Sequence, residues 1–171
     1  MKEIEVKELS LNPMTLIAKG WMLITAGTEE NGFNTMTASW GGMGSLWGKG
    51  GGMPVTTIYI RPQRYTKVFA DREELYTLSF LPEEYRQQLV YLGRHSGRDE
   101  DKVAKTGLTP VFGDGYTYFD EASMVFICRK LYRSPILESG FIDKAVMEDA
   151  YPDKDFHDMY IGEIIKVLVK E

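Results

Sequence analysis

Two segments of this 171-residue chain carry side chains suited to a phosphorylated, flat ligand. The first is the strand-like run Asn34-Thr35-Met36-Thr37-Ala38-Ser39-Trp40, whose small polar residues allow a planar ring to lie against exposed peptide groups. The second is the turn Arg61-Pro62-Gln63-Arg64-Tyr65-Thr66, which follows another strand-like run. Two guanidinium groups and a hydroxyl at a strand-to-helix turn suit a phosphate. Together the segments favour a phosphorylated planar aromatic cofactor, and flavin mononucleotide (FMN) fits best.

The turn after residue 60 has two readings. If Thr66 caps a short helix that runs to Asp71, its hydroxyl and the first amides of that helix meet phosphate oxygens, and Arg61 and Arg64 neutralise them. On these residues alone, a capping threonine beside two solvated arginines is equally consistent. The position of the turn directly after a strand favours the ligand.

A second candidate anion site is the run from His95 to Lys102. Ser96 is expected to cap a helix there, and Lys102 is expected to reach a phosphate or a flavin oxygen. The alternative is a surface helix whose Asp99 and Asp101 favour its amino-terminal end. Taken alone, this segment fits the alternative better, because charged short helices are common.

The glycine-rich run from Gly41 to Gly52 contains seven glycines and Lys49. It fails the phosphate-loop pattern, because Met43 stands five residues before Gly48 and Gly50 follows the lysine. The dinucleotide pattern G-x-G-x-x-G is absent from it as well. We expect a mobile loop beside the site, with Met43, Leu46 and Trp47 covering the ligand; an unstructured hairpin connection is an equally good reading.

Two further side chains carry groups that take part in enzyme chemistry. Cys128 falls on the Met124 and Phe126 face of a strand, where a thiol acts as a small buried hydrophobe, so we expect no catalytic role for it. His157 lies just ahead of the last strand and is the one candidate catalytic side chain, placed to approach a ligand at a barrel mouth. A partly solvated structural histidine is the simpler reading of that residue.

Composition limits the classes of protein. A chain of this length with 43% hydrophobic residues is expected to form a single domain over residues 1–171. The net charge of −5 argues against a nucleic-acid binder, and one cysteine with two histidines excludes a self-contained zinc site, so no metal is predicted. The mixed charges of residues 1–8 do not form a signal peptide, and no apolar run is long enough to cross a membrane. We therefore expect a soluble cytoplasmic protein.

The apolar pattern is mostly strand-like. It predicts strands over residues 20–26, 34–40, 54–60, 74–80, 122–132 and 158–169. The last strand is apolar on both sides near its end, which is typical of a central strand or an interface. Helices are expected over residues 66–71, 82–93 and 98–105, the last one ended by Gly107, and more weakly over 141–150. Many strands with few helices predict a mainly β protein, a closed or split barrel with helical connections.

With these elements in order, the sequence resembles the flavin reductase-like, FMN-binding split-barrel proteins, especially the flavoredoxin-type branch. The matching elements cover nearly the whole chain: Asn34 to Gly41, Arg61 to Thr66, Ser96 to Lys102, and Tyr160 to Ile164. The resemblance implies a six-stranded antiparallel barrel of Greek-key type that forms a homodimer, with FMN near the subunit interface. The glycine-rich run departs from this pattern, because relatives pass more directly from Trp-Gly to the next strand.

The resemblance also implies roles for residues. Asn34, Thr35 and the strand formed by Met36, Thr37, Ala38, Ser39 and Trp40 would lie along the isoalloxazine ring, mostly through backbone groups, with Trp40 packed near it. The positions expected to engage the phosphate or the polar edge of the ring are Arg61, Arg64, Thr66, Ser96 and Lys102, and Tyr65 is counted with the cofactor-binding residues.

Three functions follow from this interpretation. The first is an NAD(P)H-dependent flavin reductase that passes hydride through flavin N5, with His157 helping to seat the nicotinamide. The second is an FMN-binding electron carrier that never reacts with a nicotinamide and serves a redox partner protein. The third, a barrel without a cofactor, leaves the paired arginines unexplained. Expected partners are small-molecule flavin and nicotinamide, with no nucleic acid and no membrane.

Overall fold

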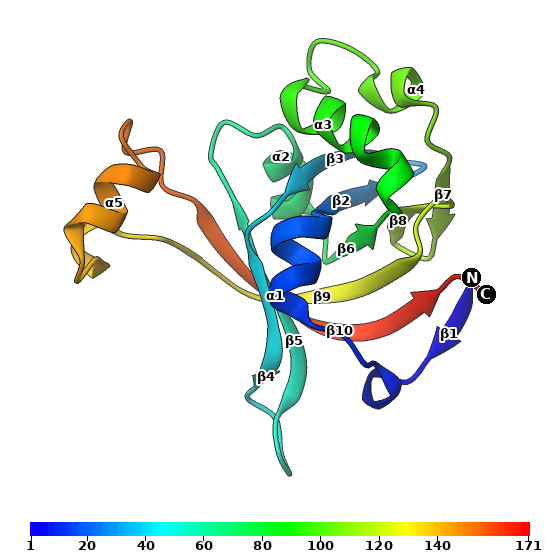
Figure 1. The fold of residues 1–171 in the computed structure, drawn as a ribbon, viewed down its shortest axis with the longest axis horizontal. Coiled ribbons are helices and arrows are strands. Elements are labelled where there is room, and N and C mark those ends of the chain that lie inside the picture. Colours follow the sequence, from blue (N-terminus) through cyan, green and yellow to red (C-terminus); the bar gives the residue numbers. More distant parts are fainter.

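The computed structural model describes all residues 1–171 and is built around one eight-stranded antiparallel sheet (Figure 1). The strands follow the order β3-β2-β6-β9-β10-β5-β4, and β1 pairs with β10. Their bounds are β1 Lys2–Ile4, β2 Met22–Thr28, β3 Gly32–Ala38, β4 Gly41–Leu46, β5 Met53–Ile60, β6 Leu75–Phe80, β9 Met124–Pro135 and β10 Asp158–Val169. A separate hairpin pairs β7 (Pro110–Gly113) with β8 (Tyr116–Phe119).

Short helices connect these strands. They are α1 (Pro13–Thr15, continued by a wider turn over Leu16–Gly20), α2 (Thr66–Arg72), α3 (Arg86–Arg94), α4 (Lys102–Thr106) and α5 (Lys144–Ala150). In Figure 1, α2, α3 and α4 gather at the end of the molecule that holds β3, whereas α5 lies on an arm well away from the sheet. None of the helices combines the length and the apolar character that spanning a bilayer demands.

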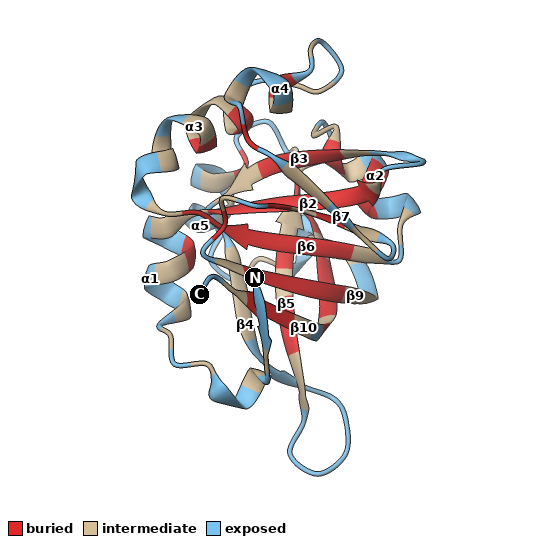
Figure 2. Ribbon diagram, turned by 90° about the vertical axis from the view of Figure 1, so that its right-hand side faces the viewer, coloured by how far each residue is buried: buried red, intermediate tan, exposed pale blue.

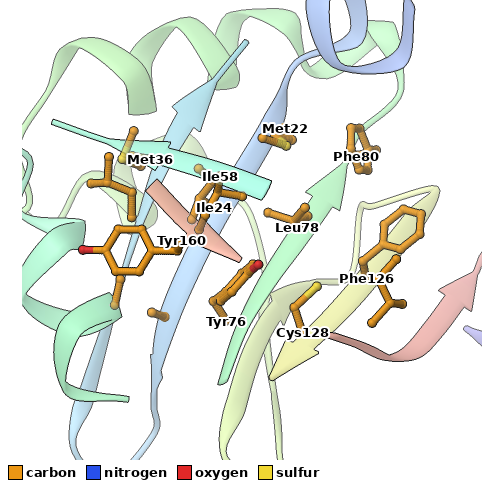
Figure 3. Close-up of a cluster of buried hydrophobic side chains, with 14 of the residues drawn as sticks. Met22, Ile24, Met36, Ile58, Tyr76, Leu78, Phe80, Phe126, Cys128 and Tyr160 are labelled. Carbon is orange, nitrogen blue, oxygen red and sulfur yellow. The ribbon is translucent and has the colours of Figure 1, made fainter. Parts of the chain in front are cut away.

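The core fills both faces of the curved sheet, because alternate side chains of each strand point to opposite sides. On β9, Phe126 and Cys128 join one buried cluster, and Val125 and Ile127 join the other. Figure 3 shows the first cluster, in which Tyr76 of β6 also takes part. Burial is concentrated in β2, β6, β9 and β10, and the tip of the β4–β5 hairpin is exposed (Figure 2). The face predicted for Met124, Phe126 and Cys128 on β9 is confirmed.

The predicted fold class, a mainly β split barrel with short helices, is confirmed. The last strand coincides with residues 158–169 and lies centrally between β9 and β5, as its two apolar sides indicated. The number of strands is larger than the expected six, because β1, β4, β7 and β8 have no clear alternating pattern of their own.

The glycine-rich run is not the loop that the sequence suggested. Its first half is β4, which pairs with β5 from Gly41 opposite Ile58 to Leu46 opposite Met53. Backbone hydrogen bonds to β5 form this strand, and they require no side-chain pattern. Only residues 47–52 form the turn, which Trp47 enters with a φ of +52°.

Two helix caps also differ from expectation. Helix α2 begins at Thr66, but the capping position is Tyr65 and no side chain caps the helix. Helix α4 begins only at Lys102, because Asp101, not Ser96, accepts a hydrogen bond from the amide of Ala104, 3.0 Å away. Ser96 instead accepts from the amide of Arg98 in a preceding turn. The end of α4 at Gly107 is confirmed, with a φ of +69°.

Position 162, in the middle of β10, has no room for a side chain. A Cβ atom on Gly162 would lie 2.4 Å from the hydroxyl oxygen of Tyr76, whose buried ring is held by a 2.7 Å hydrogen bond between that hydroxyl and Thr56. We expect Gly162→Ala to lower the free energy of unfolding by about 1–3 kcal/mol, the usual cost of an overpacked core, measured by urea denaturation. Gly44→Ala is the control, because a Cβ there meets nothing within 4 Å. Equal stability of the two variants would contradict this account of the packing.

Candidate functional site

The site lies where the sheet is open. β3 stands at one end of the strand order and pairs only with β2, so the peptide groups along its outer edge have no strand partner. The turn between β5 and α2, the end of α3 and the start of β10 contribute residues to the cavities beside this edge. An unpaired strand edge offers hydrogen-bonding groups in a row, which suits a flat polar ligand.

A cavity of about 210 Å³, here called the cationic pocket, lies beside the start of β3. It is lined by Asn34, Met36, Arg61, Gln63, Arg64, Tyr65, Thr66, Arg94, His95, Ser96 and Lys102. Four of these residues are lysine or arginine, and none is aspartate or glutamate. On a chain with a net charge of −5, such a cavity is a local concentration of positive charge that suits an anion.

The carboxyl end of α3 holds two of these cations. Arg64 donates a 2.7 Å hydrogen bond from Nη1 to the carbonyl of Gly93, and Lys102 donates from Nζ to the carbonyls of Leu92 (2.9 Å) and His95 (3.0 Å). Cations near a helix carboxyl terminus are stabilised by the unpaired carbonyls and the helix dipole. Burial and the nearby Arg64 charge lower the pKa of Lys102 to about 8.

Arg61 is tied to the arm that carries α5. Its Nη2 donates a 3.0 Å hydrogen bond to the carbonyl of Ala150, and its Nη1 forms an ion pair with Asp155. The guanidinium carbon lies 5.2 Å from the centre of the Tyr151 ring. Asp155 therefore compensates part of the charge that Arg61 brings to the site, whereas Arg64 and Lys102 donate to carbonyl oxygens.

The hydroxyl of Thr66 connects α2 with β3. It accepts a 2.7 Å hydrogen bond from the side-chain amide of Asn34, and both residues are buried. This contact explains why Thr66 does not cap its helix: its hydroxyl is turned toward β3 and the cationic pocket. The neighbouring Tyr65 lies under the guanidinium group of Arg98, 4.7 Å from the ring centre.

A second cavity of about 150 Å³, here called the aromatic pocket, continues the site along the end of β3. It is lined by Met36, Thr37, Ala38, Ser39, Trp40, Tyr59, Arg61, Arg64 and His157. The two pockets share Met36, Arg61 and Arg64, so they adjoin. The Trp40 ring lies 5.1 Å from the ring of His157.

The donor set fits a phosphate attached to a flat ring. Cations and a hydroxyl line one compartment, and small side chains, aromatic rings and an unpaired strand edge line the next. In agreement with this geometry, the family model described as "Flavin reductase like domain" matches residues 14–171 of the sequence. The chain belongs to the flavin reductase-like family.

The following solved structures share the fold and are distant in sequence. Flavoredoxin of Desulfovibrio vulgaris is 23% identical, with a TM-score of 0.67 over 100% of this chain and 77% of that one. An FMN-binding protein from Thermus thermophilus is 19% identical (TM-score 0.66; 100% and 83%). An NADH:FAD oxidoreductase of Streptomyces globisporus is 18% identical (TM-score 0.63; 88% and 75%). No curated protein matches the sequence.

In this flavin reductase-like chain, the two pockets bring together every predicted site residue except Thr35. The Thr35 side chain is fully buried, and its hydroxyl shares a 2.8 Å hydrogen bond with the hydroxyl of Thr25 on β2. Thr35 therefore has only its backbone to offer a ligand. Leu46 and Trp47 line neither pocket; Trp47 lies against Tyr132, with 6.2 Å between the ring centres.

His157 is a neutral, buried imidazole. Its Nδ1 is 2.8 Å from the hydroxyl of Tyr151, and burial together with the nearby Arg61 charge lowers its pKa to about 4. A histidine with this pKa carries no proton to give near pH 7, so it acts through hydrogen bonding and shape. It is a positioning candidate and not a general acid.

Cys128 lies outside the site, as predicted. It is fully buried, its sulfur accepts a hydrogen bond from Thr56 at 3.3 Å, and burial raises the pKa of the thiol to about 12. A thiol with this pKa is not a nucleophile at neutral pH.

Sequence reasoning missed Arg94. This residue lies in the last turn of α3, is exposed, and makes no hydrogen bond or ion pair within the chain, yet it lines the cationic pocket. Its signal was present, since a basic residue near the end of a predicted helix favours an anion beside it. Only the fold shows that this helix end meets the turn after β5.

Proposed function

We propose that this protein binds FMN and acts as an NAD(P)H-dependent flavin reductase. The observation that carries the proposal is the cationic pocket, which is free of carboxylates and opens onto the aromatic pocket along the unpaired edge of β3. A phosphate monoester on a flat heterocycle matches both compartments at once.

The residues divide between the two ends of the cofactor. Arg64, Arg94, Lys102 and the Thr66 hydroxyl would hold the phosphate. The edge of β3 from Asn34 to Trp40 would lie along the ring through its backbone groups, with the indole of Trp40 beside it. Of the positions that the resemblance gave to the phosphate or the polar edge of the ring, Arg64, Thr66 and Lys102 are proposed here for the phosphate, with one addition, Arg94.

FMN, when bound, supplies the hydride acceptor of the reaction. Arg61 and Arg64 line both pockets, so their charge lies where it stabilises negative charge on a bound ring. His157, held neutral and oriented by Tyr151, would donate or accept one hydrogen bond to seat the nicotinamide. No side chain of the site is required to exchange a proton for hydride transfer.

The relatives support this function at the level of chemistry. The Thermus thermophilus protein is an FMN-binding protein, and the Streptomyces globisporus protein is an NADH:FAD oxidoreductase. The likeness to flavoredoxin of Desulfovibrio vulgaris favours the second candidate, a flavoredoxin-like FMN-binding electron carrier that does not itself use a nicotinamide. Both functions use the same flavin site, so a reaction must separate them.

A homodimer is part of the proposal. The arm between β9 and β10 projects from the sheet and exposes apolar side chains at Leu137, Ile142 and Val146 (Figure 1). Ile142 is fully exposed within one chain. Apolar groups grouped on a projecting arm are typical of a surface covered by a second subunit.

Anaerobic stopped-flow spectroscopy tests the function. The protein loaded with FMN is mixed with NADH or NADPH, and the absorbance of the oxidised flavin is followed. We expect at least one of the two nucleotides to bleach the flavin absorbance at least as fast as the enzyme turns over in the steady state. FMN binding without bleaching by either nucleotide would identify the carrier, and no FMN binding would reject both flavin functions.

The phosphate end is tested at Arg94, whose side chain makes no hydrogen bond or ion pair within the chain. We expect Arg94→Gln to weaken FMN binding roughly tenfold, because one hydrogen bond to a charged group is worth about 1.5–3 kcal/mol. The free energy of unfolding should not change. Lys2→Gln removes an equal charge from an exposed position on β1 and serves as the control. Fluorescence titration gives the affinities, and equal affinities in the two variants would place the phosphate elsewhere.

The affinity for FMN should depend on pH through Lys102. The free protein loses the Lys102 proton as the pH rises through about 8, and the neutral amine no longer attracts the phosphate. The phosphate itself stays dianionic above its second pKa near 6. We expect affinity to fall about tenfold from pH 7 to pH 9. Lys102→Met should bind weakly with a flat profile; a steep profile in that variant would contradict the assignment.

A further inference from the structure

The connection between α3 and α4, residues 95–101, contributes His95 and Ser96 to the lining of the cationic pocket. Lys102 is the first residue of α4 and follows this connection directly. One of the two carbonyl groups that hold its ammonium group, that of His95, belongs to the start of the connection. The shape of residues 95–101 therefore decides whether Lys102 keeps its place in the pocket.

Glu100 fastens this connection to α3. Its Oε1 accepts a 2.9 Å hydrogen bond from the hydroxyl of Tyr91 and lies 2.7 Å from Nδ1 of His95. The rings of Tyr91 and His95 are stacked, with 3.9 Å between their centres and 8° between their planes. The other carboxylate oxygen pairs with Lys105, and the side chain of Glu100 is only 16% exposed. One carboxylate thus holds the end of α3, the connection and α4 together.

Glu100 also opposes the loss of charge from Lys102. Burial and the charge of Arg64 lower the pKa of Lys102, and the charge of Glu100 raises it. Hydrogen bonds from Lys105 and Tyr91 lower the pKa of Glu100 itself, so its carboxylate is ionised at neutral pH. The other charged or titratable side chains in the two cavities that Lys102 lines are Arg61, Tyr65, Arg94 and His95 on one side, and Glu29, Arg98, Asp99 and Asp101 on the other.

We propose that Glu100 is a positioning residue of the phosphate site, which holds the His95 carbonyl against Lys102 and keeps the ammonium group charged. It thereby sets the pH above which the site loses its affinity for a phosphate. Glu100 does not line the cationic pocket and acts through Lys102 alone. This inference rests on the proposed function and adds the regulation of the same site by pH.

The pH profile of FMN affinity in Glu100→Gln tests this inference. Glutamine keeps the size of the side chain and an oxygen for the Tyr91 hydroxyl, but it removes the charge. We expect the fall in affinity to begin about one pH unit lower than in the wild-type protein, because an opposite charge nearby favours the charged amine by roughly this amount. Glu100→Asp keeps the charge and should keep the wild-type midpoint. Glu83→Gln, which breaks an ion pair with Arg86 ahead of α3, is the control and should match the wild type.

Two further titrations separate this role from a general loss of structure. In a Lys102→Met background, Glu100→Gln should change FMN affinity by less than about twofold, because the residue through which it acts is gone. Riboflavin, which has no phosphate, should bind equally well to the wild type and to Glu100→Gln.

The inference is wrong if Glu100→Gln leaves the pH profile unmoved, weakens riboflavin as much as FMN, or weakens FMN equally with and without Lys102. In each of these cases, FMN binding by the wild-type protein leaves the proposed function standing. A wild-type protein that binds no FMN would reject the proposed function and this inference with it.

Discussion

The carboxyl end of α3 is the feature on which the site depends. Arg64 and Lys102 line one pocket, where burial lowers the pKa of each; the charge of Arg61 lowers the pKa of Arg64 further, and the charge of Arg64 lowers that of Lys102. Three backbone carbonyls, of Leu92, Gly93 and His95, hold them there. Carbonyls satisfy the donors and supply only a partial negative charge, so the pocket stays positive. A carboxylate in their place would neutralise the cations and compete with an incoming phosphate.

The open edge of β3 is the second requirement, and it follows from the strand order. β3 and β4 are consecutive in the chain but stand at opposite ends of the sheet, because β4 turns away to pair with β5. Only Ser39 and Trp40 join the two strands, so Trp40 sits at the opening of the barrel and is 46% exposed. The Asn34–Thr66 hydrogen bond then fixes the start of α2 against this edge. The short link between β3 and β4 leaves the peptide groups of β3 free, and the Asn34–Thr66 hydrogen bond brings the cations after β5 next to them.

The sequence predicted what depends on local pattern and missed what depends on distant partners. Alternating apolar residues located β6, β9 and β10 closely, and Gly107 ended α4 as expected. Thr66 was assigned as a cap because it precedes a helix, but its hydroxyl bonds to a residue 32 positions earlier. The caps were misassigned because a hydroxyl near a helix start can serve the helix or a tertiary contact, and sequence does not separate the two.

Two further misses have the same cause. Three of the six residues of β4 are glycine, so its pairing with β5 leaves no periodic signal in the sequence. Arg94 is an ordinary basic residue at a helix end until the fold brings that end to the turn after β5. The residues predicted to contact the ring and the phosphate cluster in the sequence, within 34–40 and 61–66, and most of them line the two pockets. Their roles toward a ligand stay predictions.

The charges around the site also impose a direction on any ligand that spans it. The cationic pocket has no carboxylate, whereas a neighbouring cavity of about 580 Å³ is lined by four carboxylates, Glu29, Asp99, Glu100 and Asp101, and by two cations, Arg98 and Lys102. A phosphate gains by entering the first and loses by entering the second, while a hydroxylated sugar has the reverse preference. Two adjoining compartments of opposite charge therefore fix the order of groups along the ligand before any base or ring is recognised. In an acidic protein, this contrast depends on keeping the α3 carbonyls, and no acidic side chain, behind Arg64 and Lys102.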